Sequence, residues 1–235
     1  MRYFALGLEQ NQKMKTSISS LGSRILFLVL VGNFTLWSIT PALATTFGGA
    51  VSYSSKAQTV SFESRLKHLS IGDRTKLGLG FRTSVFISNS APFSTAEASE
   101  IEKNNIDNVE SSSFRLLATN AILFAEYALN TDYSLGLSID TLGFSFGSET
   151  NFSGASKSSI AKPSSLNLLI FDKHDRGTLN SHFLVNRRLE NDFLISFGLA
   201  HQFIEYRSNE SFEFDNQRFR MKNDALVLVL SQSIN

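Results

Sequence analysis

Apolar and polar residues alternate along most of the chain beyond its first fifty residues, which is the pattern of β-strands. In residues 75–88, apolar side chains occupy most odd positions, small or polar side chains occupy most even ones, and Phe86 is the exception. Because successive side chains of a strand point to opposite faces, this segment predicts a strand with one apolar face. Residues 60–68 repeat the pattern, and the short segment 71–73 predicts a hairpin turn between the two.

The same alternation predicts two further hairpins and a strand at each end of the chain. A change of phase near Asp140 and Thr141 indicates a β-bulge, in which one extra residue shifts the alternation. We therefore expect eight strands. They are residues 47–55, 60–68, 75–88, 113–129, 133–147, 177–188, 193–207 and 216–233.

The connections between these strands are short on one side and longer on the other. Residues 89–112 are acidic and rich in Ser and Asn, residues 148–164 are rich in Ser, Gly and Lys, and residues 208–215 are shorter. Short turns at one end and longer polar loops at the other are typical of transmembrane barrels of the outer membrane. The brief link at 56–59 fits that scheme less well.

The polar faces of the strands favour a barrel over a soluble sandwich. Small residues fit the narrow inside of a barrel, where opposite charges can also pair. Several strands are 14 to 17 residues long, well above the usual length of about five or six. A soluble secreted β-protein remains the alternative. The small residues on these faces are Gly78, Gly80, Ser84, Gly136, Ser138, Ser196 and Gly198, and the charged ones are Glu63, Arg65, Lys67, Arg82 and Glu126.

Residues 165–172 do not fit an eight-stranded scheme neatly. They alternate, but a charged segment at 172–176 interrupts them. We expect an extension of the neighbouring strand at 177–188. An inward-folded plug and an extra strand of a ten-stranded barrel are the alternatives.

The first 44 residues have the features of a secretory signal peptide. The basic residues Lys15 and Arg24 precede an apolar run at 25–31, Pro41 follows, and residues 42–44 give a small-x-small cleavage box. We expect cleavage after Ala44, which leaves residues 45–235 as the barrel domain. An uncleaved membrane anchor is the alternative, and Met14 is an alternative translation start.

Composition and charge narrow the possible functions. Hydrophobic residues make up 42% of the chain, charged residues 18%, and there is no Cys, so disulfides and thiolate metal sites are excluded. The formal net charge is +1; without residues 1–44, 18 basic and 20 acidic residues remain. This balance gives no electrostatic reason to expect nucleic-acid binding.

The pattern of strands and loops behind a signal peptide resembles the small outer-membrane β-barrels of Gram-negative bacteria, of the OmpA/OmpX type. Residues 143–147, 166–170 and 177–181 are also similar to uncharacterised bacterial barrel proteins. The resemblance implies an antiparallel up-and-down transmembrane β-barrel in the cell outer membrane. Its partners would be outer-membrane lipid and the barrel insertion machinery. The chain departs from such barrels at its end, because it finishes in Asn235 and not in an aromatic residue. No activity comes with the resemblance.

Few residues are candidates for catalysis or for binding a metal. His174 lies in a charged loop whose cations would oppose a bound metal. Ser196, His201 and Glu205 have the residue types of a hydrolase, but Ser196 has the opposite strand parity, and no nucleophile motif is present. We therefore assign no catalytic, cofactor-binding or metal residue.

The barrel itself limits the expected function. Arg218, Arg220 and Lys222 share one strand face, and we expect them to point inward or to lie at a membrane rim. An eight-stranded barrel is just wide enough to be filled by side chains, so bulk diffusion is not expected. We expect a non-enzymatic structural or surface protein with loops 89–112 and 148–176 as interaction surfaces. A lipid-modifying barrel enzyme and a soluble secreted binding protein are the alternatives.

Overall fold

The computed structural model describes residues 44–155 and 157–234. The expected signal peptide therefore lies, apart from Ala44, outside the described residues. Those residues form an all-β, antiparallel structure, as the sequence predicts, and its thirteen strands pair in one sheet. Helices are confined to α2 (Ala98–Glu102) and the 3-10 turn η1 (Glu190–Asp192) within this part of the chain. Neither of them has the length and apolar character needed to cross a membrane.

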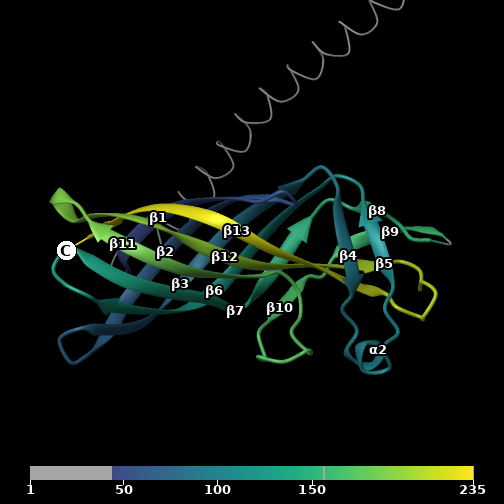
Figure 1. Cartoon of the computed structure of the whole chain (residues 1–235), viewed down its shortest axis with the longest axis horizontal. Helices are drawn as coiled ribbons and strands as arrows, with labels where there is room; N and C mark the ends of the chain where they lie inside the picture. Colours follow the sequence, from purple (N-terminus) through teal and green to yellow (C-terminus); the bar gives the residue numbers. More distant parts are fainter. Residues whose placement is uncertain (1–43, 156, 235) are drawn as a thin grey trace, which may run out of the picture. The chain divides into compact units, whose positions relative to one another are not determined.

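Eight long strands pair side by side until the last meets the first. The last of them pairs with the strand before it and also with the first strand, so the hydrogen bonding closes into a ring, which we call the main ring (Figure 1). Its strands, in order, are β1 (Ala44–Tyr53), β2 (Gln58–Ile71), β3 (Thr75–Ser88), β6 (Phe114–Ala128), β7 (Tyr133–Gly147), β11 (Leu179–Arg188), β12 (Phe193–Ser208) and β13 (Arg218–Ser233).

The expected total of eight strands, or ten, is wrong for the chain, because the segments expected to be loops contain further strands. These strands are only three to six residues long, too short for the alternation to stand out against a polar loop composition. They are β4 (Ala91–Thr95), β5 (Asn108–Ser111), β8 (Thr150–Ser153), β9 (Ser158–Pro163) and β10 (Leu166–Leu168).

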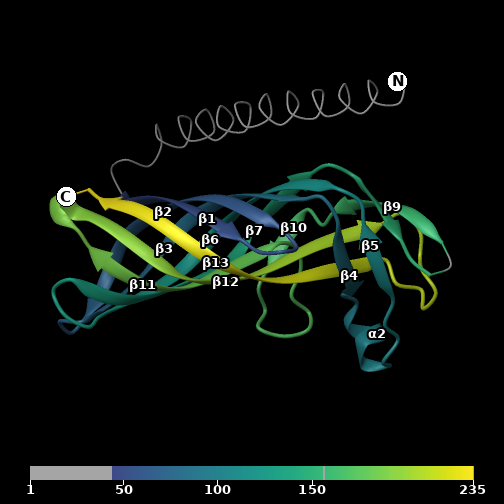
Figure 2. The ribbon, with the colours of Figure 1, turned by 45° about the horizontal axis from the view of Figure 1, so that its top comes forward.

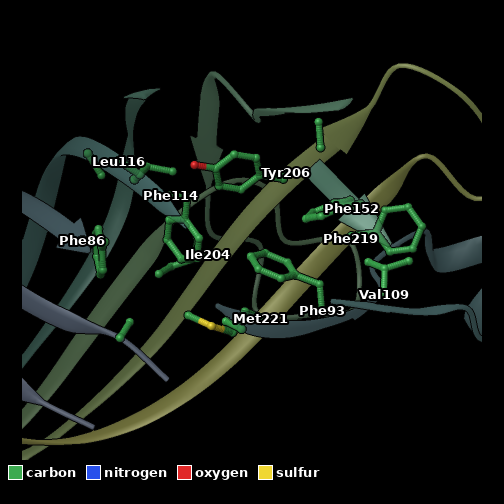
Figure 3. Close-up of a cluster of buried hydrophobic side chains, with 14 of the residues drawn as sticks. Phe86, Phe93, Val109, Phe114, Leu116, Phe152, Ile204, Tyr206, Phe219 and Met221 are labelled. Carbon is green, nitrogen blue, oxygen red and sulfur yellow. The ribbon is translucent and has the colours of Figure 1, made fainter. Parts of the chain in front are cut away.

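Four of the short strands close a second, smaller ring with β12 and β13. β4 pairs with β13 and β5, β8 pairs with β5 and β9, and β9 pairs with β12. This second ring lies at the end of the long strands opposite to the C-terminus (Figure 2). Aromatic side chains fill it: the ring of Phe93 lies 5.0 Å from that of Phe152 and 5.8 Å from that of Tyr206, and Phe219 lies 5.4 Å from Phe152 (Figure 3).

In the main ring most large apolar side chains lie outside, while polar side chains share the inside with a smaller apolar cluster that includes Leu184, Val227 and Val229. The small and charged faces expected to point inward do so, with Ser84, Ser138 and Ser196 buried, while the side chain of Lys67 is not described. The apolar faces are exposed to the surroundings. Their members include Val51, Tyr53, Leu79, Phe81, Leu123, Leu137, Leu142, Phe144, Phe146, Phe183, Val185, Ile195, Phe197, Leu199, Leu226, Leu228 and Leu230.

Local details of β7 confirm one expectation and correct part of another. The register moves from Ala121↔Leu142 to Ile122↔Asp140, so Thr141 is the extra residue of the predicted bulge. The preferred interpretation of residues 165–172 holds in part: residues 166–168 form a separate strand, β10, and not a continuous extension of β11, but β10 pairs with residues 142–144 of β7 and so continues the pairing of β11 with residues 133–139 of that strand. β10 therefore occupies part of the edge of β7 that β11 leaves unpaired.

Candidate functional site

A buried arginine ties four strands together inside the main ring. The Arg82 side chain, on β3, has no exposed surface, and its Nη2 donates to Glu63 Oε2 on β2 at 2.8 Å. Its Nη1 donates to Asp140 Oδ1 on β7 at 2.7 Å and to the carbonyl oxygen of Asn180 on β11 at 2.9 Å. The guanidinium thus bridges the interior between strands that are not neighbours.

Amide side chains extend this network toward the second ring. Asn120 Nδ2 donates to Asp140 Oδ2 at 2.7 Å, and Asn167 Nδ2 donates to Asn120 Oδ1 at 2.7 Å. Ser145 donates to Asn167 Oδ1 at 2.8 Å. Each carboxylate oxygen of Asp140 therefore accepts a bond from a side chain of another strand.

The opposite wall of the interior carries a second polar group centred on Gln202. Its Nε2 donates to Ser52 Oγ at 3.0 Å and to Thr59 Oγ1 at 3.1 Å, and its Oε1 accepts from Asn223 Nδ2 at 2.7 Å. The cavity lined by Glu63 and Ser196 has a volume of about 10 Å³, which is at the lower limit for holding one water. Bonded side chains thus occupy the interior.

The outer faces of β12 and β13 change from apolar to charged along the length of the strands. Opposite pairs run from Leu199↔Leu226 through His201↔Asp224 and Phe203↔Lys222 to the charged pairs Glu205↔Arg220 and Arg207↔Arg218. The apolar band of the wall therefore ends at the level of His201. Beyond it the wall is ionic up to the second ring.

Glu205 is the centre of this ionic region. Its Oε2 lies 2.9 Å from Arg218 Nη2 and 3.0 Å from Arg220 Nη2, and its Oε1 accepts from Ser164 Oγ at 2.8 Å. Both arginines also donate to the carbonyl oxygen of Asp175. A cavity of about 510 Å³ adjoins the cluster, and its lining includes the cations Lys162, Arg176, Arg207 and Arg218.

The three hydrolase-type residues singled out by the sequence do not come together. Ser196 points into the ring and is 3% exposed, whereas His201 lies on the outer face. Glu205 shares that outer face but is bound to Arg218 and Arg220. The carboxylate that does meet the imidazole is Asp224, whose Oδ1 lies 2.5 Å from His201 Nδ1.

The basic row at Arg218, Arg220 and Lys222 lies on the outer side of the wall. Of the two expected positions, inward or at a rim, the inward one is therefore wrong for Arg218 and Arg220, because the inward parity of β13 belongs to Phe219 and Met221. No residue between 44 and 234 that the structure describes belongs to a cluster of three metal-ligating side chains.

The segment that carries His174 contacts the helix of the first long loop. Lys173 Nζ bonds Glu102 Oε1, and this bond lowers the pKa of the Glu102 carboxyl. Glu100 on the same helix has its pKa lowered by hydrogen bonds from Asn105 and then from Lys103. The two long loops thus meet through an ion pair outside both rings.

No protein-family model matches the chain, and the search of curated proteins returned no match.

Proposed function

We propose that this protein is a β-barrel of the bacterial outer membrane, of the small Gram-negative type, in which the main ring spans the bilayer. The distribution of side chains in that ring carries the proposal. Twenty-two exposed leucine, phenylalanine, valine and tyrosine side chains of its described strands surround it, while ion pairs and amides are buried inside. Contiguous apolar surface of this extent marks a membrane or a partner interface.

The closed hydrogen bonding of the ring supports the same proposal. In hydrocarbon every backbone donor and acceptor must be satisfied by the protein, and a closed strand ring does so without leaving an edge. β13 pairs with β1 over residues 46–53 and with β12 over residues 193–207, so neither side of β13 presents a free edge there.

The second ring supports a surface role. Its apolar side chains, such as Phe93, Phe152 and Phe219, point inward, which is the arrangement of a domain surrounded by water. The protein would therefore hold a small folded domain above the membrane, with α2 as its projection and the 169–178 segment, which joins β10 to β11, beside it. Structural anchoring or binding of an external partner is the function that this architecture supports.

The test is fractionation of cells that express the full chain, followed by gel mobility with and without boiling. We expect the protein in the outer-membrane fraction and a mobility shift on heating, because a detergent-resistant barrel stays compact until it is boiled. Release by osmotic shock without detergent, with no mobility shift, would contradict the proposal and favour a soluble secreted binding protein.

A further inference from the structure

Three chemically complementary side chains lie side by side on the outer face of the main ring. Ser181 on β11 is the register partner of His201 on β12, and His201 is the register partner of Asp224 on β13. All three have the parity of the exposed apolar residues on their strands, for example Phe183, Leu199 and Leu226. Directly opposite residues on one face have Cβ atoms roughly 4.5–5.5 Å apart.

The contacts within this row assign a role to each member. Asp224 Oδ1 lies 2.5 Å from His201 Nδ1, so the carboxylate holds the imidazole through one nitrogen. Nε2 has no bonding partner among the described residues. Ser181 Oγ donates only a long bond of 3.3 Å to the carbonyl oxygen of His201, and a rotation of the Ser181 side chain is needed to bring the hydroxyl to the imidazole. Edge-on contact with Phe203, at 4.8 Å between ring centroids, also holds the imidazole in place.

We propose that Ser181, His201 and Asp224 are the nucleophile, base and orienting carboxylate of a hydrolase that cleaves acyl esters of phosphate-bearing lipids. The inference rests on the proposed function, because it requires the outer wall to face lipid. It replaces the expectation of a protein without enzymatic activity. It also differs from the trio that the sequence suggested, of which only His201 remains.

The surroundings of the row match the parts of such a lipid. Toward the apolar band lies a groove of about 370 Å³ lined by Val51, Tyr53, Phe197, Leu226 and Leu228, among others, which suits an acyl chain. Toward the second ring lies the cationic cavity of about 510 Å³ beside the Glu205 cluster, which suits a phosphate. In a phospholipid or a phosphorylated glycolipid the ester lies between acyl chain and phosphate, at the level that the row occupies.

The chemistry balances with water as the only co-reactant. Ser181 Oγ attacks the ester carbonyl carbon, and its proton passes to His201 Nε2. The bond from carbon to the alcohol oxygen then breaks, and that oxygen takes the proton from His201, which leaves an acyl group on Ser181. Water attacks this acyl group with His201 as base, Ser181 regains its proton, and a fatty acid is released. Asp224 stabilises the imidazolium in both steps.

The test uses the purified full chain in vesicles of diacyl phosphatidylglycerol and phosphatidylethanolamine, with released fatty acid measured by mass spectrometry. We expect release by the wild type and its loss, by about 10³-fold or more, in Ser181→Ala and His201→Ala. Asp224→Asn should also lower the rate, because it no longer stabilises the imidazolium. A fluorophosphonate probe should label the wild type but not Ser181→Ala.

Two matched controls separate catalysis from folding. Ser196→Ala removes an inward serine of β12, and His174→Ala removes an exposed loop histidine, so both should retain wild-type release. Heat-dependent gel mobility is recorded for every variant. Absence of release from a wild type that shows the mobility shift would overturn the hydrolase while leaving the barrel intact. Equal release from wild type and Ser181→Ala would overturn it as well. Equal hydrolysis of vesicle-embedded diacylglycerol would overturn the assignment to phosphate-bearing lipids.

Discussion

At the scale of single residues, Arg82 is the side chain on which the interior of the main ring depends most. It is fully buried and forms ion pairs with both Glu63 and Asp140, and Arg65 is a second cation beside Glu63. Removing one partner of a buried ionic group leaves uncompensated charge, which costs about 3–5 kcal/mol. We therefore expect Arg82→Ala to lower the free energy of unfolding by that amount, measured by urea titration of the protein in detergent micelles.

The matched control is Arg187→Ala, which removes an outward-facing arginine near the ring of Tyr133 and should change the unfolding midpoint little. Arg82→Lys should fall between the two, because an ammonium keeps the charge but lacks the planar fork that reaches several acceptors at once. An Arg82→Ala protein as stable as the wild type would contradict the role given to this network.

The sequence predicted part of this chemistry and missed the rest for a physical reason. Glu63 and Arg82 were expected to face inward, where opposite charges can pair, since both lie on the minority faces of a predicted hairpin; both do face inward, and the structure shows that they pair with each other. Ser181 and Asp224 lie 20 and 23 positions from His201, so only the strand register brings the three together. Ser196 and Glu205 are near His201 in the sequence, but its register partners on the neighbouring strands are Ser181 and Asp224.

At the scale of elements, the bulge in β7 sets which side chains face outward. Beyond Thr141 the exposed residues are Leu142, Phe144 and Phe146, on the parity opposite to that of Leu137. Deleting Thr141 would move these three side chains into the polar interior, since a one-residue slip exchanges the faces of a strand. We expect this deletion to abolish the heat-dependent mobility shift. Deletion of Glu213, in the loop between β12 and β13, should preserve it, and equal behaviour of the two deletions would contradict the bulge's role.

A substitution in the aromatic core of the second ring should destabilise that ring without unfolding the main ring. Phe152 is fully buried and its ring lies 5.0 Å from Phe93 and 5.4 Å from Phe219. We expect Phe152→Ala to cost about 3–5 kcal/mol within this domain and to speed proteolysis of residues 89–113 and 148–163. The mobility shift of the whole protein should persist. Unchanged proteolysis, or loss of the shift, would show that the second ring is not a separate unit of stability.

The long strands of the main ring were predictable and the short strands of the second ring were not. Strands of 10 to 16 residues repeat the alternation often enough to be recognised. β5 and β8 have four residues each; each pairs with a neighbouring short strand of its own loop, and the two also pair with each other across about forty residues of sequence. The packing of these short strands around Phe93 and Phe152 depends on tertiary contacts, and the alternation of apolar and polar residues within four positions is too short to predict it.

At the scale of the whole molecule, the filled interior predicts that the protein does not act as an open pore. The networks of Arg82 and Gln202 include side chains of seven of the eight strands of the main ring, and the eighth, β11, contributes the backbone carbonyl oxygen of Asn180. Reconstituted into planar bilayers, the wild type should show no sustained ion conductance. Stable open channels at low voltage would contradict an interior held closed by these bonds.

The central claim is that the outer face of the main ring contacts lipid while its inner face does not. Because the chain has no Cys, single cysteines can be placed one at a time at positions 225 to 230 of β13 and spin-labelled in bilayers. Labels at Leu226, Leu228 and Leu230 should collide readily with oxygen, which is enriched in lipid, and labels at Ala225, Val227 and Val229 should not. Equal accessibility along the strand, or stronger collision with a water-soluble nickel reagent at the leucine positions, would contradict the account.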